Sequence, residues 1–366
     1  MSQHYVHVIT NFTEIGGAEQ MMIRAINASE KGYKHTVISL MGVSEHMKKR
    51  LSKQVDFHAL GAKSALDLIK GAFLLKRLLV QLGNVSALYS WMYHANFVAA
   101  LSCLLANSKT PLIWGVRHSL DDYRGEKLST KIAILGGKLL SRVPKHIVHC
   151  SKKAMHQHIE FGYGKASQCV YIPNGYQFEQ LKQRHFEIEK LVIGAAGRFH
   201  EAKDYQTLFC AVAPVLRQNT GALLKVAGRE MTMDNPVLVE YLREFGIEPH
   251  QVELMGQQDD MVGFYHSVDF FILSSKTEGF PNVLAEASGY GCITFSTRVG
   301  DAPEIIDSER IVEIADAMAL TQLLQKYIAK TPVELREASQ SSADYVRNSY
   351  AIDVIANKLF SLGHTQ

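Results

Sequence analysis

The segment Ser274-Ser-Lys-Thr-Glu278-Gly-Phe-Pro-Asn-Val-Leu-Ala-Glu286-Ala decides the fold of this chain, because it joins the end of a strand to the start of a helix. The preceding run, Val268-Asp-Phe-Phe-Ile-Leu-Ser274, is short and apolar, as expected of a strand in a parallel sheet that is covered on both faces. Pro281 suits the first turn of a helix. The segment therefore predicts a strand, a turn and a helix of an α/β fold.

The same segment places two carboxylates around the turn Gly279-Phe280-Pro281-Asn282-Val283. Glu278 follows the carboxyl end of the strand, where open α/β sheets bind ligands. The N–H groups of Phe280, Asn282 and Val283 are expected to point from the helix start at an anion. Glu286, a turn further along the helix, is placed to accept two vicinal hydroxyls. This corner is therefore expected to bind a phosphate and a ribose.

Length and composition describe a folded protein of two domains. The chain has 366 residues, of which 47% are hydrophobic and 20% charged, and this length exceeds that of one typical core. The five cysteines are scattered and form no Cys-x-x-Cys pair, which favours reduced thiols in the cytoplasm and no zinc site. We expect no signal peptide, because the first residues lead directly into a strand. The longest apolar runs, such as 97–106, fall short of the roughly 20 residues that span a bilayer.

The net charge of +3 hides an asymmetry between the two halves. Residues 1–176 hold 22 Lys or Arg and 10 Asp or Glu, a balance of +12, and the remainder has a balance of −9. A basic half of this kind binds anionic surfaces, and the candidates are acidic lipid headgroups and nucleic acid.

Strands and helices alternate along the whole chain, which predicts two doubly wound parallel sheets of the Rossmann kind. The pattern breaks at Pro173-Asn-Gly175, and the following stretch is polar without strong periodicity. We therefore predict an N-terminal domain over residues 1–175, a linker over 176–190 and a C-terminal domain over 191–345. The last segment, 346–366, is predicted as a terminal helix, because residues 351–362 are amphipathic.

The motif from Glu278 to Ala287 resembles the signature of the retaining nucleotide-sugar glycosyltransferases of family 4, which have the GT-B fold. Other motifs follow in the family's order over nearly the whole chain: Gly16-Gly-Ala-Glu19, Ile172-Pro-Asn-Gly175, Gly197-Arg-Phe-His-Glu-Ala-Lys203-Asp204 and Val299-Gly-Asp-Ala-Pro-Glu304. The resemblance implies two Rossmann-like domains that face each other across a cleft. It also implies that the N-terminal domain binds the acceptor, that the C-terminal domain binds the donor, and that the terminal helix returns to the N-terminal domain.

The resemblance also implies roles for single residues. Arg198 and Lys203 flank a loop at the start of a helix and are expected to bind the diphosphate of the donor. Glu278 corresponds to a glutamate beside the transferred sugar, Glu286 to one that binds the ribose, and His118 to a histidine near that sugar. Gly16 and Gly17 close a strand-to-helix loop, where glycines allow a phosphate or sugar to approach the backbone.

Structural interpretations of these residues stay open. Glu278 can serve the turn alone, Glu286 can be an exposed helix carboxylate, and an isolated histidine such as His118 is usually structural. Trp91-Met-Tyr93-His94 either lines the acceptor pocket or packs in the core. The loop Val226-Ala-Gly228-Arg229 lacks the second glycine of the family's Gly-x-Gly loop, so its donor contact is open, with Arg229 as an alternative ligand of the phosphate or base.

We therefore expect a retaining hexosyltransferase that uses a nucleotide diphosphate-sugar as substrate and needs no cofactor. No metal site is visible, so cationic side chains are expected to neutralise the leaving diphosphate. The acceptor is expected to be a glycan, lipid-linked, in O-antigen or capsule assembly, and the enzyme to lie in the cytoplasm on the anionic inner face of the membrane. The alternatives are a nucleotide-sugar epimerase, which shares the fold, and a nucleic-acid-binding protein. The latter would leave the donor corner unexplained, and no nucleic-acid partner is expected.

Overall fold

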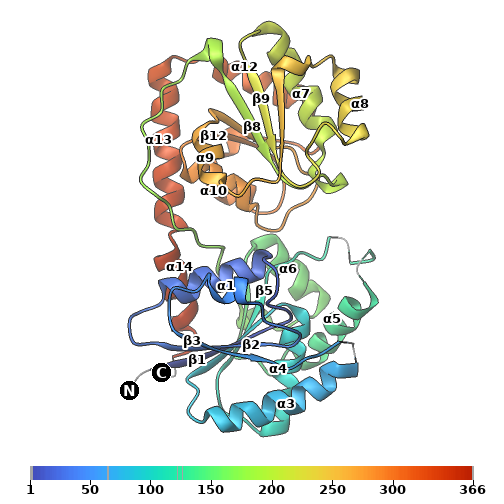
Figure 1. The fold of residues 1–366 in the computed structure, drawn as a ribbon, viewed down its shortest axis with the longest axis vertical. Coiled ribbons are helices and arrows are strands. Elements are labelled where there is room, and N and C mark those ends of the chain that lie inside the picture. The colour runs from blue at the N-terminus through green and yellow to red at the C-terminus, as the bar shows by residue number, and fades with distance from the viewer. Residues whose placement is uncertain (1–2, 64–65, 122, 126, 365–366) are drawn as a thin grey trace. The chain divides into compact units, whose positions relative to one another are not determined.

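The computed structural model describes residues 3–63, 66–121, 123–125 and 127–364. The chain forms two compact units, and each is considered by itself. Unit 1 comprises residues 1–177 and 350–366, and unit 2 comprises residues 178–349. Both units are parallel sheets with helices on their faces (Figure 1). The predicted fold class, α/β with two Rossmann-like parallel sheets, is confirmed.

Within the described part of unit 1, seven strands form one sheet in the order β3-β2-β1-β4-β5-β6-β7. All neighbouring strands pair in parallel. The strands are β1 (His4–Ile9), β2 (Lys34–Ser39), β3 (Val55–Ala59), β4 (Ala87–Trp91), β5 (Leu112–Val116), β6 (His146–His149) and β7 (Cys169–Tyr171). The helices are α1 (Gly17–Ala28), α2 (Glu45–Lys48), α3 (Leu66–Leu82), α4 (Tyr93–Ala106), α5 (Leu128–Leu140), α6 (Lys152–Phe161) and α14 (Ile352–Ser361), with a short 3-10 helix at Ala166–Gln168.

Alternate side chains of β1 pack into two core layers of unit 1, one on each face of the sheet. Tyr5 and Ile9 point to one face, where they pack with residues of α1 and α14. Val6 and Val8 point to the other face, where they pack with residues of α3, α4 and α5. Successive side chains of a strand point to opposite faces, so a strand covered on both sides reads as a continuous apolar run.

Unit 2 repeats this plan with six strands among its described residues, in the order β10-β9-β8-β11-β12-β13. The strands are β8 (Val192–Ala196), β9 (Leu223–Ala227), β10 (Val252–Gly256), β11 (Phe270–Leu273), β12 (Ile293–Thr297) and β13 (Ile311–Val312). The helices are α7 (Tyr205–Gln218), α8 (Pro236–Phe245), α9 (Met261–His266), α10 (Asn282–Gly289), α11 (Ala302–Ile305), α12 (Ala317–Ile328) and α13 (Pro332–Ser349). Short 3-10 helices lie at Ile188–Lys190, Glu201–Lys203, Pro249–Gln251 and Ser308–Arg310.

The strand order reverses between β8 and β11 in unit 2 and between β1 and β4 in unit 1. At such a reversal the connections leave the sheet in opposite directions, so the carboxyl ends of the two strands border an open crevice. In unit 2 Arg198 lies in the loop after β8, and Glu278 lies in the loop after β11. Both are candidate site residues of the sequence analysis.

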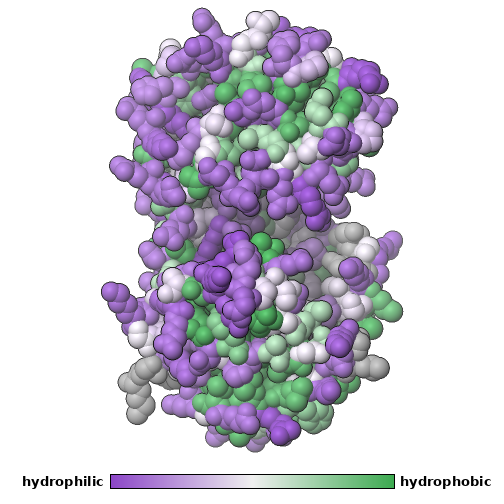
Figure 2. Space-filling view, in the orientation of Figure 1, coloured by the Kyte–Doolittle hydropathy of each residue, from purple (hydrophilic) through white to green (hydrophobic). Residues whose placement is uncertain are grey.

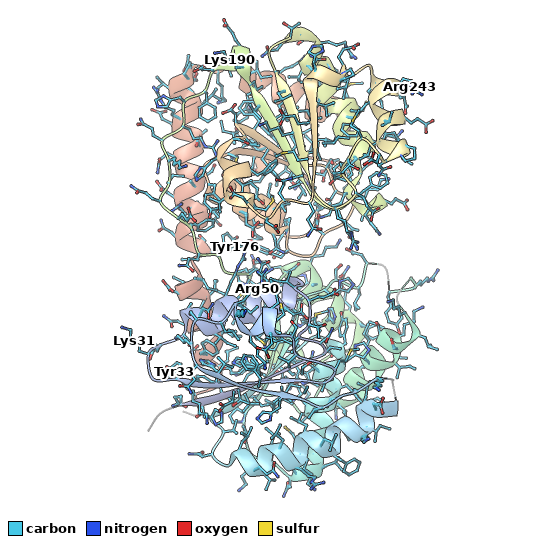
Figure 3. The ribbon with its side chains drawn as sticks, in the orientation of Figure 1. Lys31, Tyr33, Arg50, Tyr176, Lys190 and Arg243 are labelled. Atoms are coloured by element: carbon cyan, nitrogen blue, oxygen red, sulfur yellow. The ribbon has the colours of Figure 1, made fainter. Side chains whose placement is uncertain are left out.

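Most of the segment predicted as a linker, 176–190, belongs to unit 2. The Arg184 guanidinium donates to the carbonyls of Tyr265 (2.6 Å) and Tyr290 (2.8 Å), and Phe186 is buried in the core. Arg347 of α13 donates to the Glu179 carbonyl. Figure 3 labels Tyr176 and Lys190 near the two ends of this segment, which runs along α13.

The chain returns to unit 1 after α13 ends at Ser349, and the last helix, α14, packs against α1. The Tyr89 hydroxyl donates to the Leu359 and Phe360 carbonyls, both at 3.2 Å, and the Phe360 ring stacks on Tyr5. Unit 1 is therefore built from two separate stretches of the sequence.

Candidate active site

The loop after β8 holds the first two predicted ligands of the diphosphate. Gly197 follows the strand, Arg198 is exposed, and Lys203 is the last residue of the 3-10 helix Glu201–Lys203. Within the described ranges Arg198 has no ion-pair partner. The Tyr205 hydroxyl stabilises this loop, because it donates to the Gly197 carbonyl at 2.6 Å. Burial, with a smaller contribution from the Glu278 carboxylate, raises the pKa of Tyr205, so this donor stays protonated.

Lys203 and Glu278 lie against each other although 75 positions separate them in the sequence. Their Nζ and Oε1 atoms are 2.6 Å apart, and both side chains are largely buried. The Ser275 hydroxyl donates to the same Oε1 at 2.7 Å. The sequence treats the two residues as separate ligands, one for the diphosphate and one for the sugar, whereas the structure makes them an ion pair with Ser275 as a third member.

Backbone contacts hold this ion pair in place. The Ser274 hydroxyl donates to the Lys203 carbonyl at 2.9 Å, and the Lys276 N–H donates to the Ala202 carbonyl at 2.8 Å. Asp204, in the N-cap position of α7, makes no capping hydrogen bond. Its carboxylate instead accepts from the Thr207 hydroxyl at 2.7 Å and lies 3.7 Å from Lys276 Nζ. These contacts tie the end of β8 to the end of β11.

The turn from Gly279 to Val283 leads into α10 as predicted, with Pro281 in the N-cap position. The Pro281 carbonyl accepts from the Leu284 and Ala285 N–H groups, at 3.1 and 3.3 Å. For the Val283 N–H, no acceptor lies among the residues that the structure describes. The helix start therefore leaves the Val283 N–H available to a ligand, and the anion site stays a prediction.

Glu286 lies on α10 and is half-buried. The Tyr265 hydroxyl donates to its Oε2 at 3.0 Å, and the Tyr265 ring stacks on Tyr290 with 5.8 Å between ring centroids. Arg184 donates to the carbonyls of both tyrosines. Sequence reasoning missed Tyr265 and Ser275. Tyr265 lies on another helix, α9, and no local pattern marks it, whereas Ser275 stands inside the motif.

Two glycines allow neighbouring loops to approach the site. A Cβ on Gly228 would lie 1.9 Å from the Gly197 carbonyl oxygen, and a Cβ on Gly300 would lie 2.1 Å from that of Gly279. Their φ angles are +149° and +47°, a region that favours glycine. Arg229 is exposed next to the first of these loops and lies 3.6 Å from Glu230. Gly228 thus allows two backbone segments to approach closely, and the contact of this loop with the donor stays a prediction.

The predicted site residues of unit 1 lie at the carboxyl edge of its sheet. Gly16 and Gly17 join β1 to α1, and the Glu19 carboxylate folds back over Gly16. Burial raises the pKa of Glu19. His118 is exposed after β5, next to Arg117, which donates to the Ile172 carbonyl and to Asn174 Oδ1, both at 3.1 Å.

Trp91 and Tyr93 belong to the core of unit 1, which decides between the two interpretations of this aromatic motif. Both side chains are 1% exposed. Trp91 Nε1 donates to His7 Nδ1 at 3.4 Å, and the Tyr93 hydroxyl lies 2.9 Å from His158 Nε2. Their polar atoms are therefore used inside the fold.

In the parts of the chain that the structure describes, no three His, Cys, Asp or Glu side chains are grouped so that they could hold a metal ion. The same parts contain no helix that is long and apolar enough to span a membrane.

Comparison with known proteins shows what this chain resembles. Residues 190–330 match the family model of the glycosyl transferases group 1. The capsular polysaccharide biosynthesis glycosyltransferase CapM of Staphylococcus aureus is 25% identical over 60% of this chain and 61% of its own length. The lipopolysaccharide core biosynthesis glycosyltransferase LpsE of Rhizobium meliloti is 31% identical over 41% of this chain and 43% of its own. The matches thus span about half of these relatives' lengths.

The fold as a whole matches solved structures. HepE of Anabaena, solved in complex with UDP, superposes with a TM-score of 0.77 at 16% identity, over 98% of this chain and 99% of its own. At this identity the likeness concerns the fold. The protein thus has the GT-B fold, and residues 190–330 resemble the glycosyl transferases group 1.

Proposed function

We propose that the protein is a retaining glycosyltransferase that moves a hexose from a nucleotide diphosphate-sugar to a glycan acceptor without a metal ion. The observation that carries the proposal is the Lys203–Glu278 pair, 2.6 Å between Nζ and Oε1, at the strand reversal of unit 2. This pair places a cation and a carboxylate next to the helix start of α10 and next to Arg198. A diphosphate and a sugar need these groups side by side.

In the proposed reaction the acceptor hydroxyl oxygen bonds to the anomeric carbon and its proton passes to the leaving diphosphate. The bond between the anomeric carbon and the diphosphate oxygen breaks, and the diphosphate leaves with the bonding electrons. Arg198, Lys203 and the first amides of α10 stabilise the charge on that oxygen, because preorganised donors act most strongly where charge develops. An ammonium group has three N–H donors. Lys203 can therefore hold a phosphate oxygen while it donates to Glu278, whose other oxygen is then placed to orient a sugar hydroxyl.

Glu286 is proposed to accept the ribose hydroxyls, with Tyr265 fixing one of its oxygens. Gly16, Gly17 and His118 are proposed to serve the sugar and the acceptor from unit 1. The HepE complex with UDP supports a nucleotide of this class as the ligand. Retention of configuration rests on the motif from Glu278 to Glu286.

The acceptor is proposed to be a lipid-linked glycan in the assembly of a cell-surface polysaccharide. The names of CapM and LpsE, which refer to capsular polysaccharide and lipopolysaccharide core, support this class of product. The balance of +12 in residues 1–176 supports a place at the anionic inner face of the membrane, in the cytoplasm.

The test is to incubate the purified protein with a panel of nucleotide sugars, with and without membrane extract that contains lipid-linked acceptors. Release of nucleoside diphosphate that requires the extract is expected for one sugar. Conversion of the free nucleotide sugar into its epimer, with no release of diphosphate, would replace the proposal with the epimerase alternative.

A further inference from the structure

Helix α5 exposes a stripe of large apolar side chains. Leu128, Ile132, Leu135 and Leu139 recur at intervals of four, three and four residues, so they lie on one side of the helix. All four are exposed, and Leu139 reaches 84%. The opposite side of α5 packs into the core through Ala133 and Ile134. This helix is therefore apolar on both sides, and only one of them is covered.

Helix α3 repeats the pattern. Ile69, Phe73 and Val80 are exposed at intervals of four and seven residues, while Leu68 and Leu75 face the core. Helix α4 packs against both α3 and α5, and its last turn exposes Leu104 and Leu105. The three helices cover the same face of the sheet, and Figure 2 shows hydrophobic side chains gathered over α3. We call this surface, formed by the exposed residues of α3, α4 and α5, the α3–α5 face.

The charges on these helices are almost all positive. They carry Lys70, Lys76, Arg77, Lys131 and Lys138, with Asp67 as the single carboxylate in their sequences. Asp67 accepts from the Lys63 N–H at the start of α3. Lys127 and Arg142 flank α5. The α3–α5 face thus combines exposed leucine, isoleucine and phenylalanine with an excess of cations.

Large contiguous apolar surfaces are rare on soluble proteins and mark sites of interaction. Unit 2 provides the contrast, because its exposed large hydrophobic residues are spread over α8, α12, α13 and two loops: Met233, Val237, Ile314, Met318, Val333 and Tyr345. A protein partner would account for the apolar residues. The nearly uniform positive charge is complementary to an anionic lipid surface, in which cations meet headgroups and apolar side chains enter the acyl boundary.

We infer that the α3–α5 face docks on an anionic lipid bilayer, with α5 and α3 lying in the plane of the interface. This inference rests on the proposed association with the membrane and adds to it a location and a mode. The cations attract the protein to the headgroups, and Leu128, Ile132, Leu135 and Leu139 insert between the lipids. Binding then has a part that resists salt, because insertion of apolar side chains is not screened.

The experiment compares Leu139→Glu with Met318→Glu in vesicle sedimentation. Met318 lies on α12 of unit 2 and is 73% exposed, so its variant adds the same charge at a similarly exposed position. Vesicles contain phosphatidylglycerol and phosphatidylcholine, or phosphatidylcholine alone, at about 0.1 M and about 1 M salt. The wild type is expected to bind the anionic vesicles and to stay partly bound at high salt. Leu139→Glu is expected to weaken binding about tenfold, which corresponds to the loss of one inserted side chain. Met318→Glu is expected to weaken binding only slightly, because it adds one negative charge on unit 2, outside the α3–α5 face.

A second measurement does not depend on a loss of binding. The two tryptophans of the chain, Trp91 and Trp114, are buried in unit 1 and give a constant background. Leu139→Trp is expected to show a blue shift of its emission when anionic vesicles are added, whereas Met318→Trp is expected to show none. Equal vesicle binding by wild type and Leu139→Glu, together with no blue shift, would overturn the inference.

Two further results have a defined meaning. If the wild type sediments as a dimer and Leu139→Glu as a monomer, and neither binds vesicles, the α3–α5 face is an interface between two copies and the inference is wrong. Nucleotide-sugar turnover by the wild type, with detergent-solubilised membrane extract as the source of the acceptor and without vesicles, tests the proposed function separately. Turnover without vesicle binding would contradict the docking inference and leave the proposed function standing. Vesicle binding without turnover would contradict the proposed function and leave the docking inference standing.

Discussion

Units 1 and 2 share an architecture but place their polar groups in opposite ways. Unit 2 gathers paired polar groups at its strand reversal, where Lys203 meets Glu278 and Tyr265 meets Glu286. Unit 1 buries neutral histidines in its interior and shows cations and apolar side chains on its outside. His7 Nε2 lies 3.0 Å from His35 Nδ1, and both rings are fully buried. A parallel sheet determines where ligands gather, at the carboxyl ends of the strands, and leaves the outer surfaces of the helices free to serve other partners.

The largest effect is expected from loss of the cations of unit 2. Lys203→Ala and Arg198→Ala should each lower turnover by about two to three orders of magnitude, roughly 3 to 4 kcal/mol, because they stabilise the leaving diphosphate. Lys203→Ala also leaves the Glu278 carboxylate without its partner. Steady-state kinetics with the preferred donor measures the effect, and Arg243→Ala, at an exposed residue of α8, is the control. Near-normal turnover in both variants would show that Arg198 and Lys203 do not stabilise the leaving diphosphate.

Acid is expected to destabilise unit 1. Burial, with Lys53 and His4 nearby, lowers the pKa of His35 from 6.5 to about 4, and burial likewise lowers that of His158 to about 4. Both rings are neutral in the folded protein, so their stabilising effect is complete above pH 6.5. It is lost as the pH falls towards 4, by about 3 kcal/mol for each ring. Unit 2 differs, because burial raises the pKa of Asp269 and favours its protonated form.

Fluorescence of Trp91 and Trp114 follows unit 1 alone, since the chain has no other tryptophan. The urea midpoint measured in this way should decrease steadily between pH 6.5 and 4, and His35→Gln should flatten part of that decrease. A midpoint that stays constant over this range would show that the buried histidines do not control the stability of unit 1.

Glu286→Gln should weaken binding of the nucleoside diphosphate about tenfold and leave the fold intact. An amide accepts fewer hydrogen bonds from the ribose than a carboxylate and adds a donor that has no use there. Titration calorimetry measures the affinity, with Glu240→Gln, at an exposed carboxylate of α8, as the control. Unchanged affinity would identify Glu286 as a helix carboxylate without a ligand.

A smaller effect is expected at Tyr265. Tyr265→Phe keeps the ring on Tyr290 and removes the hydroxyl that donates to Glu286, so affinity for the nucleotide should fall about threefold to tenfold. The double variant with Glu286→Gln should lose little more than Glu286→Gln alone, because both changes act through one carboxylate. Fully additive losses would show that Tyr265 acts independently of Glu286.

No effect is expected from chelation. Turnover should survive exhaustive treatment with EDTA, because Arg198, Lys203 and the start of α10 supply the positive charge that a divalent ion supplies in metal-dependent enzymes. The control is a metal-dependent glycosyltransferase assayed in the same buffer. Loss of activity in EDTA and its recovery with magnesium or manganese would contradict the assignment of the cations in unit 2.

The sequence alone determines the local elements. Helix α6 runs from Lys152 to Phe161, because Ser151 caps its start and Gly162 takes the left-handed conformation at its end. The buried strands follow from their continuous apolar runs. Strand β3 is an exception, because it lies at the sheet edge with a mixed pattern, and the sequence did not reveal it.

Only the tertiary structure decides which distant residues meet. The sequence places Lys203 and Glu278 at two strand ends, but their ion pair exists because β8 and β11 are neighbours in the sheet. In the same way, Arg184 binds Tyr265 and Tyr290 from a stretch that reads as a polar linker. Propensity, capping and periodicity act over a few residues. Contacts across 75 positions depend on strand order, which the packing of the whole sheet determines.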